Sequence, residues 1–192
     1  MSKAPKHPPE YYTKKLLPVK DIVDKQWRKG RFNRMDMIMR LLCVDEYYAN
    51  GKKPGRMFKW YRKMQHIRIT KIRHIRPDKF PHGFEQRRVR QFIALIESFE
   101  KKGYDMSVKG IRLDKDWELA NGSHRMAMCI HFKIPEIPVR WPCDSTKVRR
   151  GYSVKWFSKK GFPKELIQKL EEKRVEVFNM LELKDRTTNN YI

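Results

Sequence analysis

The segment from Trp117 to Trp141, WELANGSHRMAMCIHFKIPEIPVRW, limits the fold of this chain more than any other stretch. A short strand-like run ends near Asn121, a glycine follows, and a sulfur-rich apolar helix begins near Ser123 before the next strand, EIPVRW. A glycine between a strand and a helix allows a tight turn and lets a ligand approach the backbone closely. The segment therefore predicts a strand, turn, helix and strand in sequence, with a ligand site at the turn.

The turn carries groups that suit an anion. The free amides of the first helical turn, from about Ser123 to Arg125, and the helix dipole both favour negative charge. His124 adds a tunable donor and Arg125 adds a permanent fork of donors, which together suit a phosphate group. The same residues also fit a serine N-cap followed by a surface histidine and arginine. The residue types alone leave both interpretations open.

Helical and strand-like patterns alternate along the rest of the chain. LLPVKDIV, residues 16–23, predicts a first strand that enters a turn. Asn33 is the predicted N-cap of a helix that runs to about Tyr48. Two further helices are predicted, one ended by Gly103 and one that begins after Pro163. Short strands in SVKGIRLD and WELA complete a mixed α+β pattern.

The charge balance points to anionic partners. The 192 residues include 45 Lys and Arg against 22 Asp and Glu, which gives a net charge of +23. Such a surface attracts polyanions and phosphorylated ligands. In the basic, aromatic-rich segment 55–76, six residues are predicted polyanion contacts: Arg62, Lys63, Arg68, Lys71, Arg73 and Arg76. A solvated basic face on an ordinary amphipathic element also fits this segment, and no helix-turn-helix pattern is clear in it.

Composition also restricts compartment and metal chemistry. No apolar run approaches the roughly 20 residues that span a bilayer, and the first residues lack the apolar core of a signal peptide, so a soluble, cytoplasmic protein is expected. Cys43, Cys129 and Cys143 have no CxxC spacing, which predicts reduced thiols that mostly lie in the core. No HExxH pattern occurs, and we assign no residue as a metal ligand.

Several of these segments together resemble the core of the ParB/sulfiredoxin superfamily. The order is a helix ended by Gly103, strands VKGIRLD and WELA, NGSHRMAMCIHFKI, and the strand PEIPVRW. In that group a strand leads into a G-x-[HR]-R turn, a small-residue helix and a strand with an IPV-like sequence, and LLPVKDIV is similar to the group's first strand. The matches cover residues 16–24 and about 88–141. The resemblance implies an α+β fold with a small mixed sheet and surrounding helices, plus a C-terminal helix.

On this resemblance the chain divides into three parts. Residues 1–13 are expected to form a flexible N-terminal arm. Residues 14–160 are expected to form the ParB/sulfiredoxin-like domain, with a helical, basic insertion at about 34–86. Residues 161–192 are expected to form a C-terminal helix and tail.

The resemblance also implies a nucleotide or phosphate site. ParB proteins bind CTP and DNA, sulfiredoxin uses ATP to repair an oxidised cysteine, and the free serine kinases phosphorylate a small hydroxyl compound. Ser123 stands where sulfiredoxins carry their reactive cysteine, which argues against that reaction, and the roughly 50 residues after Trp141 leave little room for the additional domains of ParB. The implied phosphate-binding residues are consecutive: Asn121, Gly122, Ser123, His124 and Arg125.

The kinase branch suggests carboxylates near the acceptor. Among the acidic residues that follow the first strand, we predict Asp36, with Glu46 farther along the same helix, as catalytic groups. Either carboxylate also fits an ordinary cap or surface charge. The expected function is binding of ATP or ADP, with Mg²⁺, and phosphate transfer to a small hydroxyl substrate such as an amino acid or a sugar. The alternative is a basic nucleic-acid-binding module without catalysis; catalysis would require a carboxylate that faces the Gly122 turn.

Overall fold

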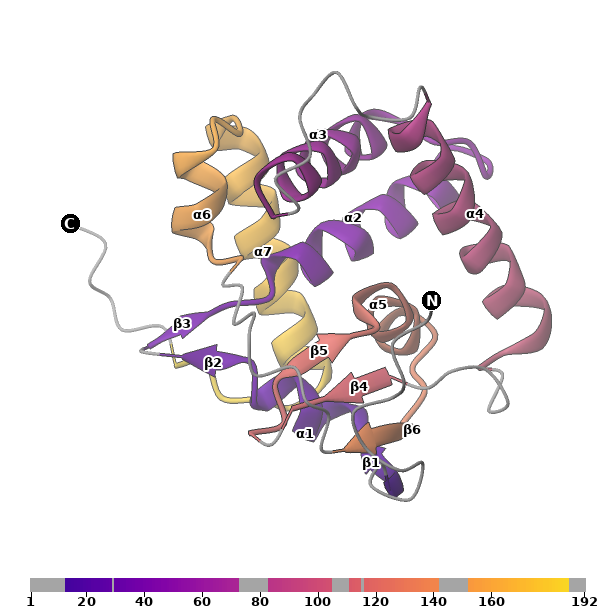
Figure 1. Cartoon of the computed structure of the whole chain (residues 1–192), viewed down its shortest axis with the longest axis vertical. Coiled ribbons are helices and arrows are strands. Elements are labelled where there is room, and N and C mark those ends of the chain that lie inside the picture. The colour runs from indigo at the N-terminus through magenta and orange to yellow at the C-terminus, as the bar shows by residue number, and fades with distance from the viewer. Residues whose placement is uncertain are drawn as a thin grey trace, which may run out of the picture.

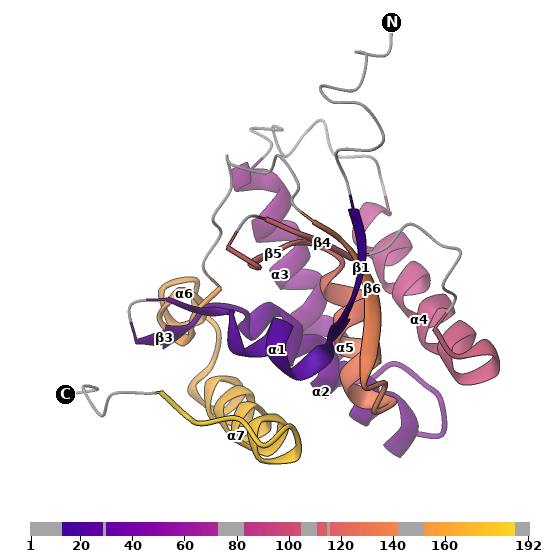
Figure 2. The same cartoon turned by 90° about the horizontal axis from the view of Figure 1, so that it is seen from below.

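A four-stranded mixed sheet lies at one end of the molecule in the computed structural model, which describes residues 13–28, 30–72, 83–104, 111–114, 116–141 and 152–186 (Figures 1 and 2). β6 pairs with β1 in antiparallel and with β4 in parallel orientation, and β5 is antiparallel to β4. The spatial order is β1 (Thr13–Pro18), β6 (Glu136–Trp141), β4 (Ile111–Leu113) and β5 (Leu119–Asn121). The predicted mixed α+β class is confirmed.

Two helices stack on the inner face of this sheet. α5 (Ser123–His131) lies directly over the strands, and α2 (Met35–Ala49) packs across α5 (Figure 1). The inner side of the sheet is apolar because alternate strand residues point to the same face, as the register pairs Leu17 with Ile137 and Ile111 with Val139. The segment predicted as an insertion thus contributes α2, whose side chains lie in the central core.

The remaining helices surround α2. α3 (Arg56–Ile72) and α4 (Phe84–Lys102) pack against each other, and α3 also contacts α2. α6 (Val154–Lys159) and α7 (Lys164–Met180) lie on the opposite side of α2 from α4 (Figure 1). The predicted apolar stripe of the C-terminal helix joins the same core as α2, with Leu166, Leu170, Val177 and Phe178 buried.

Two local predictions in the N-terminal part are wrong. Only the first half of the predicted first strand is extended, because Val19–Asp24 forms a short helix, α1, that buries Val19, Ile22 and Val23. This spacing follows a helical period. Asn33 does not cap α2: its side chain donates to the carbonyl of Arg31, and Arg34 occupies the N-cap position without a side-chain capping bond.

A short hairpin and one helix were not predicted. β2 (Trp27–Arg28) and β3 (Arg31–Phe32) form a two-stranded antiparallel pair just before α2. Ser153 is the N-cap of α6, and its side chain accepts a hydrogen bond from the amide of Trp156. Cys43 and Cys129 are buried free thiols, as predicted, and Cys143 lies outside the described residues. Within the described ranges, no helix is long and apolar enough to cross a membrane.

Candidate functional site

The turn between β5 and α5 brings the five predicted phosphate-binding residues together. Gly122 has a φ of 107°, a left-handed conformation that favours glycine, and a Cβ at this position would lie 2.8 Å from Cγ1 of Ile111. Asn121 is exposed at the end of β5, Ser123 is buried, and His124 and Arg125 are half-buried. The glycine is therefore required both by the backbone angle and by the close approach of β4.

Arg34 ties this turn to the start of α2. Its guanidinium donates to the carbonyl of Leu119 in β5 at 2.6 Å and to the hydroxyl of Ser123 in α5. The same guanidinium donates to both carboxylate oxygens of Asp36, at 2.9 and 3.1 Å. One arginine thus joins three elements, and the Ser123 side chain is engaged as its acceptor.

Asp36 also holds a second arginine, and both residues are buried. Nη1 of Arg40, one helical turn along α2, lies 3.0 Å from Oδ2 of Asp36 and also donates to the Asp36 carbonyl. Arg40 is completely buried, and its Nε and Nη2 atoms have no hydrogen-bond partner among the described residues. A buried guanidinium with unsatisfied donors is costly, so this arginine favours additional negative charge nearby. The Tyr61 ring, 5.7 Å from Cζ, supplies a cation–π contact.

His124 is neutral and bonded to a tyrosine. Nε2 of His124 lies 2.7 Å from the hydroxyl of Tyr61. Burial first, and then the charge of nearby arginines, holds the pKa of His124 well below its ordinary value. Burial is also the main reason that the pKa of Tyr61 rises to about 12. With both groups neutral, the tautomer of His124 decides whether the Tyr61 hydroxyl donates to Nε2 or accepts from it.

The surroundings of His124 are strongly cationic. Arg68 from α3 lies close enough to act on the charge of Asp36, Arg40 and His124, and no described carboxylate forms an ion pair with it. Four arginines lower the pKa of His124 after burial: Arg40, Arg68, Arg88 and Arg125. The guanidiniums of Arg34, Arg40 and Arg68 all act on one carboxylate, that of Asp36. The site therefore has an excess of positive charge that an anionic ligand would neutralise.

Asp36 has an environment that differs from that of a general base. Burial alone would raise its pKa, but the attraction of Arg34, Arg40 and Arg68 holds the pKa below its ordinary value. Both carboxylate oxygens accept hydrogen bonds from guanidinium groups. A carboxylate with a lowered pKa is a weak proton acceptor. The contacts of Asp36 instead indicate that it orients the guanidinium groups of Arg34 and Arg40.

Glu46, the second predicted catalytic residue, lies ten residues farther along α2, which places it about 15 Å from Asp36 along the helix axis. Its carboxylate accepts a hydrogen bond of 2.8 Å from the amide of Met57 in the first turn of α3. This contact satisfies a free amide at a helix start. The structure thus does not bring the two predicted catalytic carboxylates together.

Gly55 allows Glu46 to make this contact. A Cβ on Gly55 would lie 2.5 Å from the Glu46 carboxyl carbon and 2.6 Å from the Asn50 amide nitrogen. We expect Gly55→Ala to displace the Glu46 carboxylate and lower the free energy of unfolding by about 1 kcal/mol, the usual cost of a lost cap. Urea unfolding of Gly55→Ala, made in the wild type and in the Glu46→Ala variant, would test this. In the Glu46→Ala background, the cost of Gly55→Ala should largely disappear.

The predicted polyanion contacts do not form one surface. Arg62 is exposed on α3, whereas the Arg68 guanidinium lies over the Tyr152 ring, 6.0 Å from its centroid, and its charge helps to lower the pKa of Asp36. The Nζ atom of Lys63 donates to the carbonyl of Gly161 at 2.6 Å and lies over the ring of Phe162. The Lys71 side chain and residues Arg73 and Arg76 lie outside what the structure describes.

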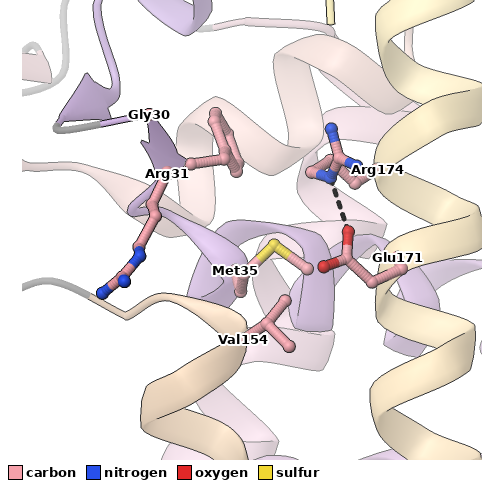
Figure 3. A pocket seen from close by; sticks show the side chains of 7 residues that line it. Gly30, Arg31, Met35, Val154, Glu171 and Arg174 are labelled. Atoms are coloured by element: carbon pink, nitrogen blue, oxygen red, sulfur yellow. Dashed lines mark hydrogen bonds and ion pairs between the residues drawn. The ribbon is translucent and has the colours of Figure 1, made fainter. Parts of the chain in front are cut away.

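A pocket elsewhere contains an ion pair. It lies between β3, α6 and α7; Arg174 and Glu171, both on α7, form the pair, and Arg31 also lines the pocket (Figure 3). Nε of Arg174 lies 2.7 Å from Glu171, and Nη1 lies 3.0 Å from Asp185. Its guanidinium also packs over the rings of Trp27 and Phe178. Arg174 is thus neutralised, in contrast to the arginines near Asp36.

Sequence reasoning missed Arg40 and the partnership of Tyr61 with His124. A signal for Arg40 was present, because it is a lone arginine in the apolar run from Met37 to Val44 and follows Asp36 by four residues. That spacing places the two side chains on one face of a helix. No comparable signal identifies Tyr61, which is 63 residues from His124 in the chain.

Comparison with known proteins gives no further assignment. No protein-family model, no curated protein and no solved structure matches the chain. Within the described part of the chain, no three His, Cys, Asp or Glu side chains gather in a way that could hold a metal ion. The functional interpretation therefore depends on the geometry and charge of the site.

Proposed function

We propose that this chain binds a nucleotide through its phosphate groups at the first turn of α5, within a fold of the ParB/sulfiredoxin type. The observation that carries the proposal is the excess of positive charge around Asp36 and His124. Arg34, Arg40 and Arg68 all act on the single carboxylate of Asp36, and Arg40 retains unsatisfied buried donors. A phosphate group supplies the negative charge that such a cluster favours, and the completely buried Arg40 would act on it through its charge and not through a contact.

The backbone of the turn supports the same ligand. α5 begins at Ser123, and the positive end of its helix dipole adds to the charge of the arginines. His124, which is hydrogen-bonded to Tyr61, lies in the first turn of the same helix. ATP or ADP is the nucleotide proposed, and a bound Mg²⁺ would be held chiefly by its phosphate oxygens.

We propose binding rather than phosphoryl transfer as the function, because neither predicted carboxylate is arranged as a base. Asp36 holds two guanidiniums, and Glu46 caps α3. Transfer to a hydroxyl substrate also needs a group that orients the acceptor. The arrangement of strands and helices is compatible with the ParB/sulfiredoxin resemblance, which stays part of the proposal.

Removal of Arg125 tests the site. We expect Arg125→Ala to weaken the binding of ATP and ADP by about 10-fold to 150-fold, because a charge-assisted bond to phosphate contributes about 1.5 to 3 kcal/mol. Isothermal titration calorimetry of each nucleotide, with and without Mg²⁺, measures the effect. Melting temperatures of the unliganded proteins should be similar, since Arg125 is only half-buried.

Arg90→Ala is the matched control, because Arg90 is an exposed arginine on α4 and its removal changes the net charge equally. Its nucleotide affinity should stay within about twofold of wild type, as expected for a distant surface charge. Equal affinities of wild type and Arg125→Ala, or equal losses in both variants, would contradict the proposed site.

A further inference from the structure

A second feature of the molecule, separate from the nucleotide site, is a pair of helices that lack acidic residues. No Asp or Glu occurs between Glu46 and Asp78, a stretch that contains α3, or between Asp144 and Glu165, a stretch that contains α6. A chain with 22 acidic residues thus leaves both helices without internal neutralisation. Basic blocks of this kind are a feature of nucleic-acid-binding surfaces.

The fold brings these two helices together. The Trp60 ring of α3 lies 6.1 Å from the ring of Phe162, which follows α6, and Lys63 bonds the carbonyl of Gly161. Figure 1 shows α6 beside α3, at the end of the molecule away from the sheet. Two basic segments about 90 residues apart in the chain therefore become neighbours.

The outer side of α3 is basic and exposed. Lys59, Arg62 and His66 are exposed and are spaced three and four residues apart, which places them on one stripe of the helix. On α6, Lys155 and Lys159 are exposed and four residues apart. Within the described residues, no carboxylate forms an ion pair with Lys59, Arg62, Lys155 or Lys159.

Aromatic residues accompany this charge. Trp60 and Trp156 are half-buried and contact Phe162, and Lys63 lies over the rings of Trp60 and Phe162, at 5.6 and 4.9 Å. These rings hold α3 and α6 against each other, so the exposed cations project from a rigid support. Such a support lowers the entropic cost of presenting several charges to one extended partner.

We propose that the exposed cations of α3 and α6 form an interface for the phosphate backbone of a nucleic acid. We name this surface the α3–α6 basic face and define it by Lys59, Arg62, Lys155 and Lys159. A nucleic acid fits because its charges are closely and regularly spaced, and neutralising them releases counter-ions. We expect these cations to contact phosphate groups, which position a nucleic acid without reading its sequence. The sequence predicts a nucleic-acid-binding module as the alternative function, with contacts between residues 62 and 76. Of those predicted contacts, only Arg62 belongs to the α3–α6 basic face.

Salt-dependent binding tests this interface. Fluorescence anisotropy of the full chain with a labelled 24-base-pair DNA duplex, and with an RNA strand of the same length, is measured from 50 to 300 mM KCl. We expect Lys59→Gln/Arg62→Gln and Lys155→Gln/Lys159→Gln each to weaken binding by at least about fivefold at 100 mM KCl. Each pair should also reduce the slope of log K against log salt by about 1 to 2, since one phosphate contact contributes about 0.9.

The matched control is Lys101→Gln/Lys102→Gln, which removes two exposed lysines from the last turn of α4, outside the α3–α6 basic face. It should change affinity by less than about twofold and leave the slope unchanged. Failure to bind either nucleic acid at 50 mM KCl, an equal loss in the control, or equal competition by poly-glutamate would each overturn the proposal. Tighter binding of the DNA or of the RNA would identify which one the face prefers.

Discussion

Asp36→Asn is expected to lower the free energy of unfolding by about 3 to 5 kcal/mol, because it leaves the completely buried Arg40 without its counter-charge. For a chain of this length, about 2–4 °C is lost per kcal/mol, so the melting temperature should fall by about 6 to 20 °C. Urea unfolding followed by circular dichroism measures the change. Asparagine has nearly the same shape as aspartate, so the effect reports charge and not packing.

The pH dependence of this loss has a defined sign. The folded pKa of Asp36 lies below its ordinary value, so ionised Asp36 stabilises the fold above the unfolded pKa of about 4. That contribution is lost as pH falls through the lowered folded pKa. The difference between wild type and Asp36→Asn should therefore be largest at neutral pH and should shrink at about pH 3 or below.

Glu172→Gln serves as the control, since Glu172 is an exposed carboxylate on α7 whose contact is with Gln168. Its unfolding free energy should stay within about 0.5 kcal/mol of wild type. If Asp36→Asn were as stable as wild type at neutral pH, its role in holding Arg40 would be wrong. Asp36 would then again be a candidate for the catalytic base, as the sequence alone predicts.

Gly122→Val is the second substitution with a large expected effect. The φ of 107° is strained for a branched residue, and the new Cβ would lie 2.8 Å from Cγ1 and 3.2 Å from Cα of Ile111. We expect a loss of about 2 to 5 kcal/mol in unfolding free energy from strain and overpacking together. Since the turn carries the proposed phosphate site, the fraction that folds should also bind ATP and ADP more weakly.

Gly83→Val separates the two causes. Gly83 has a left-handed conformation like that of Gly122, with a φ of 76° and a ψ of 13°, but a Cβ there meets no atom within 4 Å. This variant should therefore show only the cost of backbone strain, about 1 to 2 kcal/mol, with unchanged nucleotide affinity. Equal destabilisation at the two glycines would show that contact with Ile111 contributes nothing at Gly122.

Local features of the chain were predictable where they depend on neighbouring residues. The Gly122 turn, the start of α5 at Ser123 and the end of α4 before Gly103 follow from glycine and from helical periodicity. The wrong prediction at Val19–Asp24 has the same origin, because so short a segment, with three apolar and three charged residues, fits a strand or a helix until its packing is known.

The arginine cluster could not be read from the sequence because its members meet only in the fold. Arg34 reaches Ser123 across 89 residues of chain, and Tyr61 reaches His124 across 63. A single chain offers many arginines and no indication of which ones are buried. Asp36 was identified as a special residue, but the role that its contacts indicate is to hold two cations rather than to accept a proton.

α3 lies between the proposed nucleotide site and the α3–α6 basic face and contributes residues to both. Its inner side presents Tyr61 and Arg68 to the surroundings of His124, and its outer side carries Lys59 and Arg62. Any ligand that shifts or stiffens this helix from one side therefore changes the free energy of binding on the other. Thermodynamic reciprocity requires the two effects to be equal, so a nucleotide that alters affinity for a polyanion must have its own affinity altered by the same factor.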